Sequence, residues 1–156
     1  MQLPELSPTR VETLFRDKNK NKDLPSFCWF FYNHQVWNSF RLNDENLNTW
    51  QMLPQGEPGI YQIECIQTGK KYIGESKNIQ QRFWSTYNTL QQGTHPSNSF
   101  QTDWKKFGPQ NFFFTILYAD ERFALKSLRK KVENFFVYEN RTNVYNEVSK
   151  YGLNNL

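Results

Sequence analysis

Two tyrosines and a glycine stand close together in "GIYQIECIQTGKKYIG", residues 59–74, at positions Tyr61, Tyr72 and Gly74. The segment is typical of two short strands around a tight turn. A phenol can hydrogen-bond, and at neutral pH it takes up a proton readily only where a nearby cation or metal favours the phenolate, because its pKa is near ~10. Half-buried packing in the strands is the alternative role for both rings, and the hairpin alone does not decide between packing and chemistry.

The register of this hairpin determines where the tyrosines lie. A two- or four-residue turn over "QTGK" predicts that residue 65 pairs with residue 72 and residue 63 with residue 74. Opposed residues share a face of the sheet, so Tyr61 and Tyr72 are expected on one face, and Gly74 leaves a gap opposite Ile63. A turn of odd length would place the two rings on opposite faces. Twist or a bulge is needed to bring the two hydroxyls together.

Hydrophobic periodicity predicts the elements that follow the hairpin. Residues 77–93 predict a helix that Gly93 ends, with an apolar stripe of Ile79, Phe83, Tyr87 and Leu90. Residues 98–108 indicate a second short helix, and 112–118 a central strand covered on both faces. Residues 121–139 predict an amphipathic helix whose inward side chains are Leu125, Leu128, Val132, Phe135 and Phe136. The fold class is α+β, a small three-stranded antiparallel sheet flanked by helices.

The residues before the hairpin are predicted to form an N-terminal extension. "LPQGEPG" at 53–59 holds two prolines and two glycines and marks a joint. Residues 7–16 are typical of a short helix, which Ser7 would cap. Residues 27–42 are rich in aromatic and β-branched residues and predict a second hairpin around "NH". Packing is favoured over base stacking for this aromatic cluster.

Composition limits the classes of function. Residues 1–58 hold 6 basic and 7 acidic side chains (−1), whereas residues 59–156 hold 13 basic and 8 acidic ones (+5). A basic, aromatic-rich segment is compatible with nucleic acid, because phosphates attract cations and bases stack on rings. No apolar run approaches the roughly 20 residues that span a bilayer, and the N-terminus lacks a signal-peptide pattern. We therefore expect an intracellular, soluble protein. The two cysteines and two histidines lack zinc-site spacing, which favours reduced, buried thiols.

The spacing of the two tripeptides resembles that of the GIY-YIG endonucleases. "GIY" at 59–61 and "YIG" at 72–74 match the defining signatures, and the likeness extends over about residues 59–148. Further positions match residues of the family's site in order: Arg82, His95, Glu133 in "VENFF" and Asn146 in "VYNE". The resemblance implies three regions: an extension at 1–58 for DNA recognition or structure, a nuclease domain at 59–148, and a tail at 149–156.

The resemblance implies a metal-dependent hydrolysis of DNA phosphodiesters and a role for each residue. Tyr61 would take a proton from water, directly or through a relay, and Tyr72 would position water or phosphate. Arg82 would bind phosphate oxygens, and Glu133 would hold one Mg²⁺ or Mn²⁺ ion. His95 and Asn146 would complete the catalytic site. Substrate-binding roles are expected for Gly74, Lys70, Lys71, Lys77 and Tyr87. The assignment requires the two phenols, the guanidinium and the carboxylate to converge on one phosphate.

Two departures from the family pattern leave alternatives open. Homing members tend to carry a second histidine one turn after Arg82, where this chain has Thr86, so Tyr87 or a water would take that place. Homing members also usually append a DNA-binding region after the catalytic domain, whereas here 58 residues precede it, a layout closer to restriction-type members. Target selection would then come from the N-terminal segment, a homodimer or a partner.

Three other functions remain as alternatives to a homing- or restriction-type nuclease. They are a DNA-binding module that has lost cleavage, a structure-specific repair or recombination nuclease, and an interaction domain without a nucleic-acid role. The Asn-, Lys- and Gln-rich composition would suit an AT-rich genome, such as that of an organelle or a phage.

Overall fold

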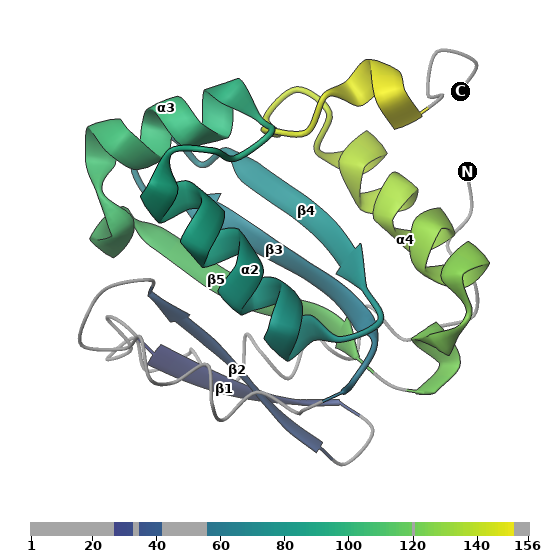
Figure 1. Cartoon of the computed structure of the whole chain (residues 1–156). Helices are drawn as coiled ribbons and strands as arrows, with labels where there is room; N and C mark the ends of the chain where they lie inside the picture. Colours follow the sequence, from purple (N-terminus) through teal and green to yellow (C-terminus); the bar gives the residue numbers. More distant parts are fainter. Residues whose placement is uncertain (1–26, 33–34, 42–55, 120, 152–156) are drawn as a thin grey trace.

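The protein was examined as a computed structural model, which describes residues 27–32, 35–41, 56–119 and 121–151. Five antiparallel strands form one sheet in the order β1-β2-β5-β3-β4 (Figure 1). The strands are β1 Phe27–Tyr32, β2 Gln35–Arg41, β3 Gly59–Cys65, β4 Lys71–Ser76 and β5 Phe112–Ala119. The predicted three-stranded antiparallel sheet is confirmed as β5-β3-β4, and the N-terminal hairpin extends it beyond β5.

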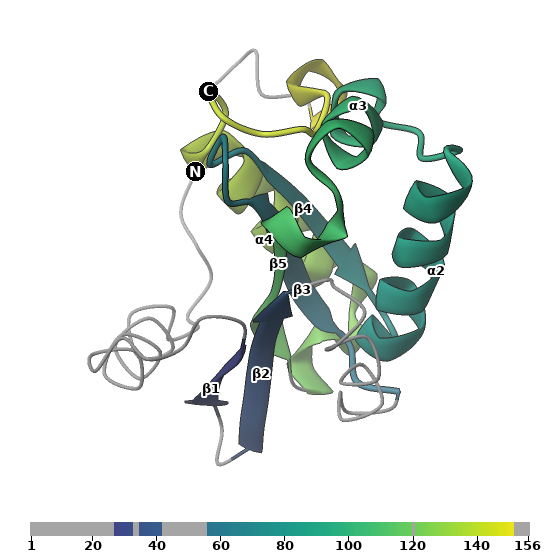
Figure 2. The same cartoon turned by 90° about the vertical axis from the view of Figure 1, so that its left-hand side faces the viewer.

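Three helices flank the sheet: α2 Ile79–Gln92, α3 Asn98–Phe107 and α4 Lys126–Glu139. Helices α2 and α3 cover one face and α4 covers the other (Figure 2). The predicted stripe of α2 is buried, and Gly93 ends that helix with φ 79°. In the described part of the chain, no helix combines the length and apolar character of a membrane span. The predicted helix at 7–16 and residues 53–55 of the joint lie outside the described residues.

The β3–β4 hairpin has a different register from the predicted one. Ile63 pairs with Tyr72, and Tyr61 pairs with Gly74. The turn spans residues 66–69 and closes with a hydrogen bond from Gly69 N–H to the Cys65 carbonyl at 2.8 Å. This register differs by two residues from the prediction, so the tyrosines keep their common face. Gly74 now lies opposite Tyr61.

Strand β5 occupies the central position that its sequence predicts, between β2 and β3. Alternate residues are fully buried, whereas the side chains between them are only half-buried. The prediction of equal cover on both faces is therefore only partly right. Phe114 illustrates the well-covered face, where it packs against Phe83 of α2 and Tyr61 of β3.

Helix α4 begins later than predicted, because residues 121–124 form a separate 3-10 turn. Leu125 precedes the helix in an extended conformation and is 66 % exposed, so its predicted inward position is wrong. The buried residues of α4 are instead Arg129, Val132, Glu133 and Val137. Leu128 and Phe136 are partly buried against the core, and Phe135 is half-buried. The inward face of α4 thus includes two charged side chains, which face β4.

Candidate active site

The outer edge of β4 is closed by hydrogen bonds from residues distant in sequence. Among the described strands, β4 lies at one end of the sheet, and an edge strand leaves backbone groups without sheet partners. The segment after α4 pairs with its start, where Lys71 N–H donates to Asn143 O at 3.1 Å and Tyr145 N–H donates to Lys71 O at 2.8 Å. These bonds fix the chain after α4 beside β4.

Asn146 occupies the middle of this edge. Its Oδ1 accepts from Ile73 N–H at 2.9 Å, and its Nδ2 donates to the Ile73 carbonyl at 2.7 Å. The side chain therefore satisfies both outward backbone groups of Ile73, as a neighbouring strand would. This position fits the predicted organising role of Asn146, because Ile73 lies between Tyr72 and Gly74.

Arg82 and Glu133 meet at the next outward-facing residue of β4, which is Glu75. The backbone N–H of Glu75 donates to the Glu133 carboxylate, and Arg82 Nη1 donates to the Glu75 carbonyl at 3.3 Å. Arg82 belongs to α2 on one face of the sheet, and Glu133 belongs to α4 on the other. One edge residue of β4 therefore brings the predicted guanidinium and the predicted carboxylate together.

Tyr61 reaches the same region from β3. Its ring is 1 % exposed and fills the space beside Gly74, since a Cβ at position 74 would lie under 3 Å from the phenol. Thr86 and Arg82 hydrogen-bond the phenol. Burial nevertheless raises the pKa of Tyr61 above its ordinary value of 10.0, because desolvation outweighs the charge of Arg82 and the two hydrogen bonds. The expected cation is present, but Tyr61 is protonated at neutral pH in the free protein.

Tyr72 and His95 pack against one another beside Phe100. The rings of Tyr72 and His95 meet edge to face with centroids 4.9 Å apart. Ser97 N–H donates to His95 Nδ1 at 3.0 Å, which leaves Nε2 as the protonated nitrogen of the neutral ring. Burial lowers the pKa of His95, so this histidine is neutral at pH 7. Burial also raises the pKa of Tyr72, and Tyr61, Glu133 and Arg82 act on it electrostatically.

These electrostatic effects place the four predicted groups in one neighbourhood. Glu133 raises the pKa of both Tyr61 and Tyr72, whereas Arg82 lowers both. Because such effects decay with distance, Glu133 and Arg82 lie near enough to both phenols to act on their pKa values.

Glu133 is a buried carboxylate with incomplete charge compensation. Its nearest described cation is Lys130, at 3.8 Å from Oε1, and Lys130 also contacts Glu75 at 3.3 Å. Arg129, one turn before Glu133 in the same helix, pairs with Glu75 instead at 2.6 Å. Burial raises the pKa of Glu133, Lys130 opposes this, and Glu75 adds to it.

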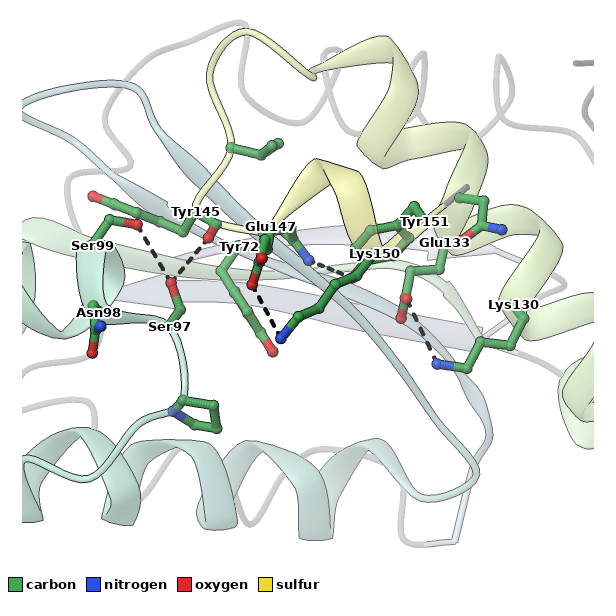
Figure 3. Close-up of a pocket in the computed structure, with 14 residues that line it drawn as sticks. Tyr72, Ser97, Asn98, Ser99, Lys130, Glu133, Tyr145, Glu147, Lys150 and Tyr151 are labelled. Carbon is green, nitrogen blue, oxygen red and sulfur yellow. Dashed lines mark hydrogen bonds and ion pairs between the residues drawn. The ribbon is translucent and has the colours of Figure 1, made fainter. Parts of the chain in front are cut away.

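A polar groove of about 740 Å³ opens beside these residues (Figure 3). Glu133 and Tyr72 line it, and Lys130 and Lys150 contribute positive charge. The N-terminal turn of α3 forms a further wall with Ser97, Asn98 and Ser99. Both lysines are paired with carboxylates, Lys150 with Glu147 at 3.0 Å and Lys130 with Glu75 and Glu133, so the charges of the lining are balanced.

None of the predicted substrate-binding residues, Gly74 included, lines the groove. Lys70 Nζ lies over the Tyr145 ring at 5.9 Å, and Lys71 Nζ donates to Asn140 Oδ1 at 3.4 Å. Lys77 is exposed beyond β4. Tyr87 is 5 % exposed and packs within the core, which suits packing rather than substrate contact. These three lysines and Tyr87 are absent from the groove lining.

Tyr87 does not take the place of the histidine that homing members carry. Its hydroxyl accepts from Gln91 Nε2 at 3.1 Å, and its ring stacks on Trp84. The residue that reaches Tyr61 is Thr86 itself, whose side chain is buried and bonds the phenol. A hydroxyl therefore occupies the predicted position of an imidazole.

The structure adds residues that sequence reasoning missed. Lys130, Lys150 and Glu147 lie in the groove, and Tyr151 hydrogen-bonds both Glu133 and Asn146. Glu75 follows "YIG" directly, and its position beside the motif is the one signal that could have identified it. Tyr151 lies in a 3-10 turn without periodicity, so no pattern indicates its contact with Glu133.

The groove lies beside the Tyr72 phenol and the Glu133 carboxylate, whereas Tyr61 and Arg82 are absent from its lining. Among the described residues, no three His, Cys, Asp or Glu side chains are grouped to hold a metal ion. Glu133 still fits a hard divalent ion, because it is a buried, incompletely compensated carboxylate at an open polar groove. Magnesium in particular is commonly held by one or two carboxylates, with water and substrate phosphate completing the shell.

Comparisons with known proteins agree with this geometry. The family model of the GIY-YIG catalytic domain matches residues 57–146. Two solved structures of the catalytic domain of the intron or homing endonuclease I-TevI, one of them a mutant, each have a TM-score of 0.52 to this chain. Their sequence identities are 30% for the mutant and 32% for the other; the matches cover 58% of this chain and 92% and 97% of those chains. The search of curated proteins found no match. The chain belongs to the GIY-YIG family, with its nuclease domain at residues 57–146.

Proposed function

We propose that this protein is a metal-dependent endonuclease that hydrolyses DNA phosphodiester bonds. The observation that carries the proposal is the convergence of Tyr61, Tyr72, Arg82 and Glu133 at the outer edge of β4, beside a groove that holds Lys130 and Lys150. Phosphate attraction needs cations, and phosphodiester cleavage needs proton transfer and charge stabilisation at one point. These groups supply both.

In this proposal Tyr61 receives the proton of the attacking water, directly or through a relay. Arg82 and Thr86 hold its phenol in place, and Arg82 offers further N–H donors to a phosphate oxygen. Tyr72 lines the groove and positions water or phosphate. Because burial raises the pKa of Tyr61, the phenolate is the minor form, and the rate is expected to rise with pH.

Glu133 is the proposed ligand of one Mg²⁺ or Mn²⁺ ion. When bound, the ion would supply charge neutralisation at the scissile phosphate and the departing oxygen. The chain holds the carboxylate by a hydrogen bond from the Glu75 backbone and by the Tyr151 hydroxyl. His95 acts as a neutral N–H donor beside Tyr72, and Asn146 keeps the β4 edge in position.

Cleavage of supercoiled plasmid tests the proposal. The purified chain with Mg²⁺ is expected to nick or linearise the plasmid, and EDTA or Glu133→Gln is expected to abolish this. Glu139→Gln serves as a matched control, because Glu139 is an exposed residue at the end of the same helix. Binding without cutting, across several metals and substrates, would refute the nuclease and favour a DNA-binding module that has lost cleavage. That second candidate is favoured by the threonine at position 86 and by the raised pKa of Tyr61.

The biological role within the family is a finer proposal. We favour the restriction-type layout over the homing type, because the added strands β1 and β2 precede the nuclease domain and extend its sheet. Mapping the cut ends on a random-sequence library would separate the two, since a long asymmetric site indicates homing and a short symmetric site indicates a dimeric restriction enzyme. Sedimentation with and without DNA would test the homodimer.

A further inference from the structure

The hydroxyl of Tyr151 connects two residues of the proposed site. It accepts from Asn146 Nδ2 at 2.8 Å, and it hydrogen-bonds the Glu133 carboxylate. Tyr151 is the last residue of the 3-10 turn Val148–Tyr151 and lines the groove beside Glu133 (Figure 3). It also lies beyond residue 146, where the match to the family model ends. The contact is therefore an addition to the matched domain.

Counting donors gives this chain of hydrogen bonds a direction. An amide NH₂ has two hydrogens, and Asn146 Nδ2 uses one on the Ile73 carbonyl and the other on the Tyr151 oxygen. The Tyr151 oxygen thus accepts, and its single hydrogen remains for Glu133. An ionised carboxylate can only accept, so the Tyr151 O–H must donate to it. The backbone N–H of Glu75 is the second donor to the same carboxylate.

Two donors from different segments of the chain therefore hold the Glu133 carboxylate in place. One belongs to the rigid edge of β4, and the other belongs to the turn that follows Asn146. Hydrogen-bonded partners of metal-binding carboxylates set the orientation of the ligand, and their loss commonly weakens metal affinity by about 10–100-fold. Tyr151 has the geometry of such a partner.

We propose that Tyr151 is a positioning residue that orients Glu133 toward its divalent ion, so that the turn at residues 148–151 is part of the active site. The inference rests on the proposed function, because it needs Glu133 to be the metal ligand. In this role the Tyr151 hydroxyl acts through Glu133 and does not bind the ion itself. Its ring remains half-buried, and only its hydroxyl carries the effect.

Binding of Mn²⁺ to the full chain in complex with DNA tests this role without relying on cleavage. In a Tyr61→Phe background, which is expected to prevent cutting, bound Mn²⁺ is measured by electron paramagnetic resonance. Adding Tyr151→Phe is expected to weaken Mn²⁺ binding about tenfold, measured at saturating DNA so that a change in DNA affinity does not contribute. Tyr138→Phe is the control, because Tyr138 is a half-buried tyrosine of α4 outside the groove lining.

Glu133→Gln in the same background distinguishes a failure of the Tyr151 role from a failure of the proposed metal ligand. Loss of Mn²⁺ binding in Glu133→Gln together with unchanged binding in Tyr151→Phe would overturn the role of Tyr151 and leave the proposed function intact. Unchanged binding in Glu133→Gln would overturn the metal assignment and the inference with it. In the wild-type background, the cleavage lost by Tyr151→Phe at limiting metal is expected to return at about tenfold higher metal, as a weakened metal site requires.

Discussion

Replacement of Gly74 by alanine tests whether the position of the Tyr61 phenol limits the reaction. A Cβ at position 74 would meet three atoms of the phenol, and the most distant of them, Cε1, would lie at 2.8 Å. Carbon atoms in ordinary contact lie about 3.5–4.0 Å apart, so the ring must move by about 1 Å. Tyr61 is 1 % exposed and stacks on Phe114, so its ring has little free space.

The expected result of Gly74→Ala is a large loss of rate with a smaller loss of stability. A displacement of about 1 Å at a reacting group can cost about 100-fold in rate, or about 2.7 kcal/mol. Overpacking a core commonly costs about 1–3 kcal/mol, so most of the protein remains folded. Single-turnover nicking of supercoiled plasmid measures the rate, and urea unfolding measures the stability.

A double-mutant cycle with Tyr61→Phe identifies the cause. If Gly74→Ala acts by displacing the Tyr61 hydroxyl, it should change the already reduced rate of Tyr61→Phe by less than about threefold. Equal losses in both backgrounds would refute this reasoning, and so would full activity in a folded Gly74→Ala protein. Gly59→Ala is a contrasting variant, because its Cβ would meet the backbone carbonyl of Tyr118 and should reduce folding instead.

Three further changes probe the site. Asn146→Ala leaves two buried backbone groups of β4 without partners and should lower the free energy of unfolding by about 2–4 kcal/mol, measured in urea. Thr86→Val removes a hydrogen bond that lowers the pKa of Tyr61, so cleavage near pH 7.5 should fall by about 2–10-fold; in both proteins the rate should rise about tenfold per pH unit below that pKa. Arg129→Met leaves the Glu75 carboxylate without its closest cation and should cost about 3–5 kcal/mol at pH 7.

The contribution of Glu75 to the free energy of unfolding also depends on pH. Burial tends to raise the pKa of Glu75, but the hydrogen bond and charge of Arg129 and the charge of Lys130 outweigh it and lower the pKa below 4.5. A carboxyl group with a lowered folded-state pKa stabilises the protein above its unfolded-state value, and this stability is lost as the pH falls through the folded-state pKa. The stability gap between wild type and Arg129→Met should therefore narrow below about pH 4.5. A stability difference that does not change with pH in that range would contradict the Arg129–Glu75 pairing.

The cleavage rate provides a separate test: a rate that does not change between pH 6 and 9 would contradict Tyr61 as the proton acceptor.

Local patterns in the sequence were sufficient for helices α2 and α3, for the central place of β5 and for the common face of the tyrosines. Periodicity identifies α2 through Ile79, Phe83 and Leu90, all of which are buried. The register of the hairpin could not be obtained in this way, because a turn over 66–69 and a turn over 67–70 have similar residue types. The choice depends on Gly69, which adopts φ 73°, and on the fit of Tyr61 against Gly74.

The charged residues on the inward face of α4 could not be predicted from local sequence patterns for a different reason. A helix pattern assigns buried positions to apolar residues, so it predicts Leu125 inside and gives no reason to place Arg129 there. Arg129 is buried because its partner Glu75 lies on β4, 54 residues away in sequence. Contacts of this kind, and the one between Tyr151 and Glu133, become visible only when the fold brings the two segments together.

The two edges of the sheet have different tasks, and this separation limits what the N-terminal hairpin can do. β4 forms the edge that carries the proposed site, while β2 pairs with β5 and β1 forms the opposite edge among the described strands. Neighbouring strands lie about 4.8 Å apart, so four spacings place β1 about 19 Å from β4. If the duplex runs across the strands, the rise of about 3.4 Å per base pair places a DNA contact of the hairpin about five to six base pairs from the cut. In that orientation the hairpin would contribute to the choice of a site only at that distance, and selection next to the scissile bond would come from residues of the groove itself.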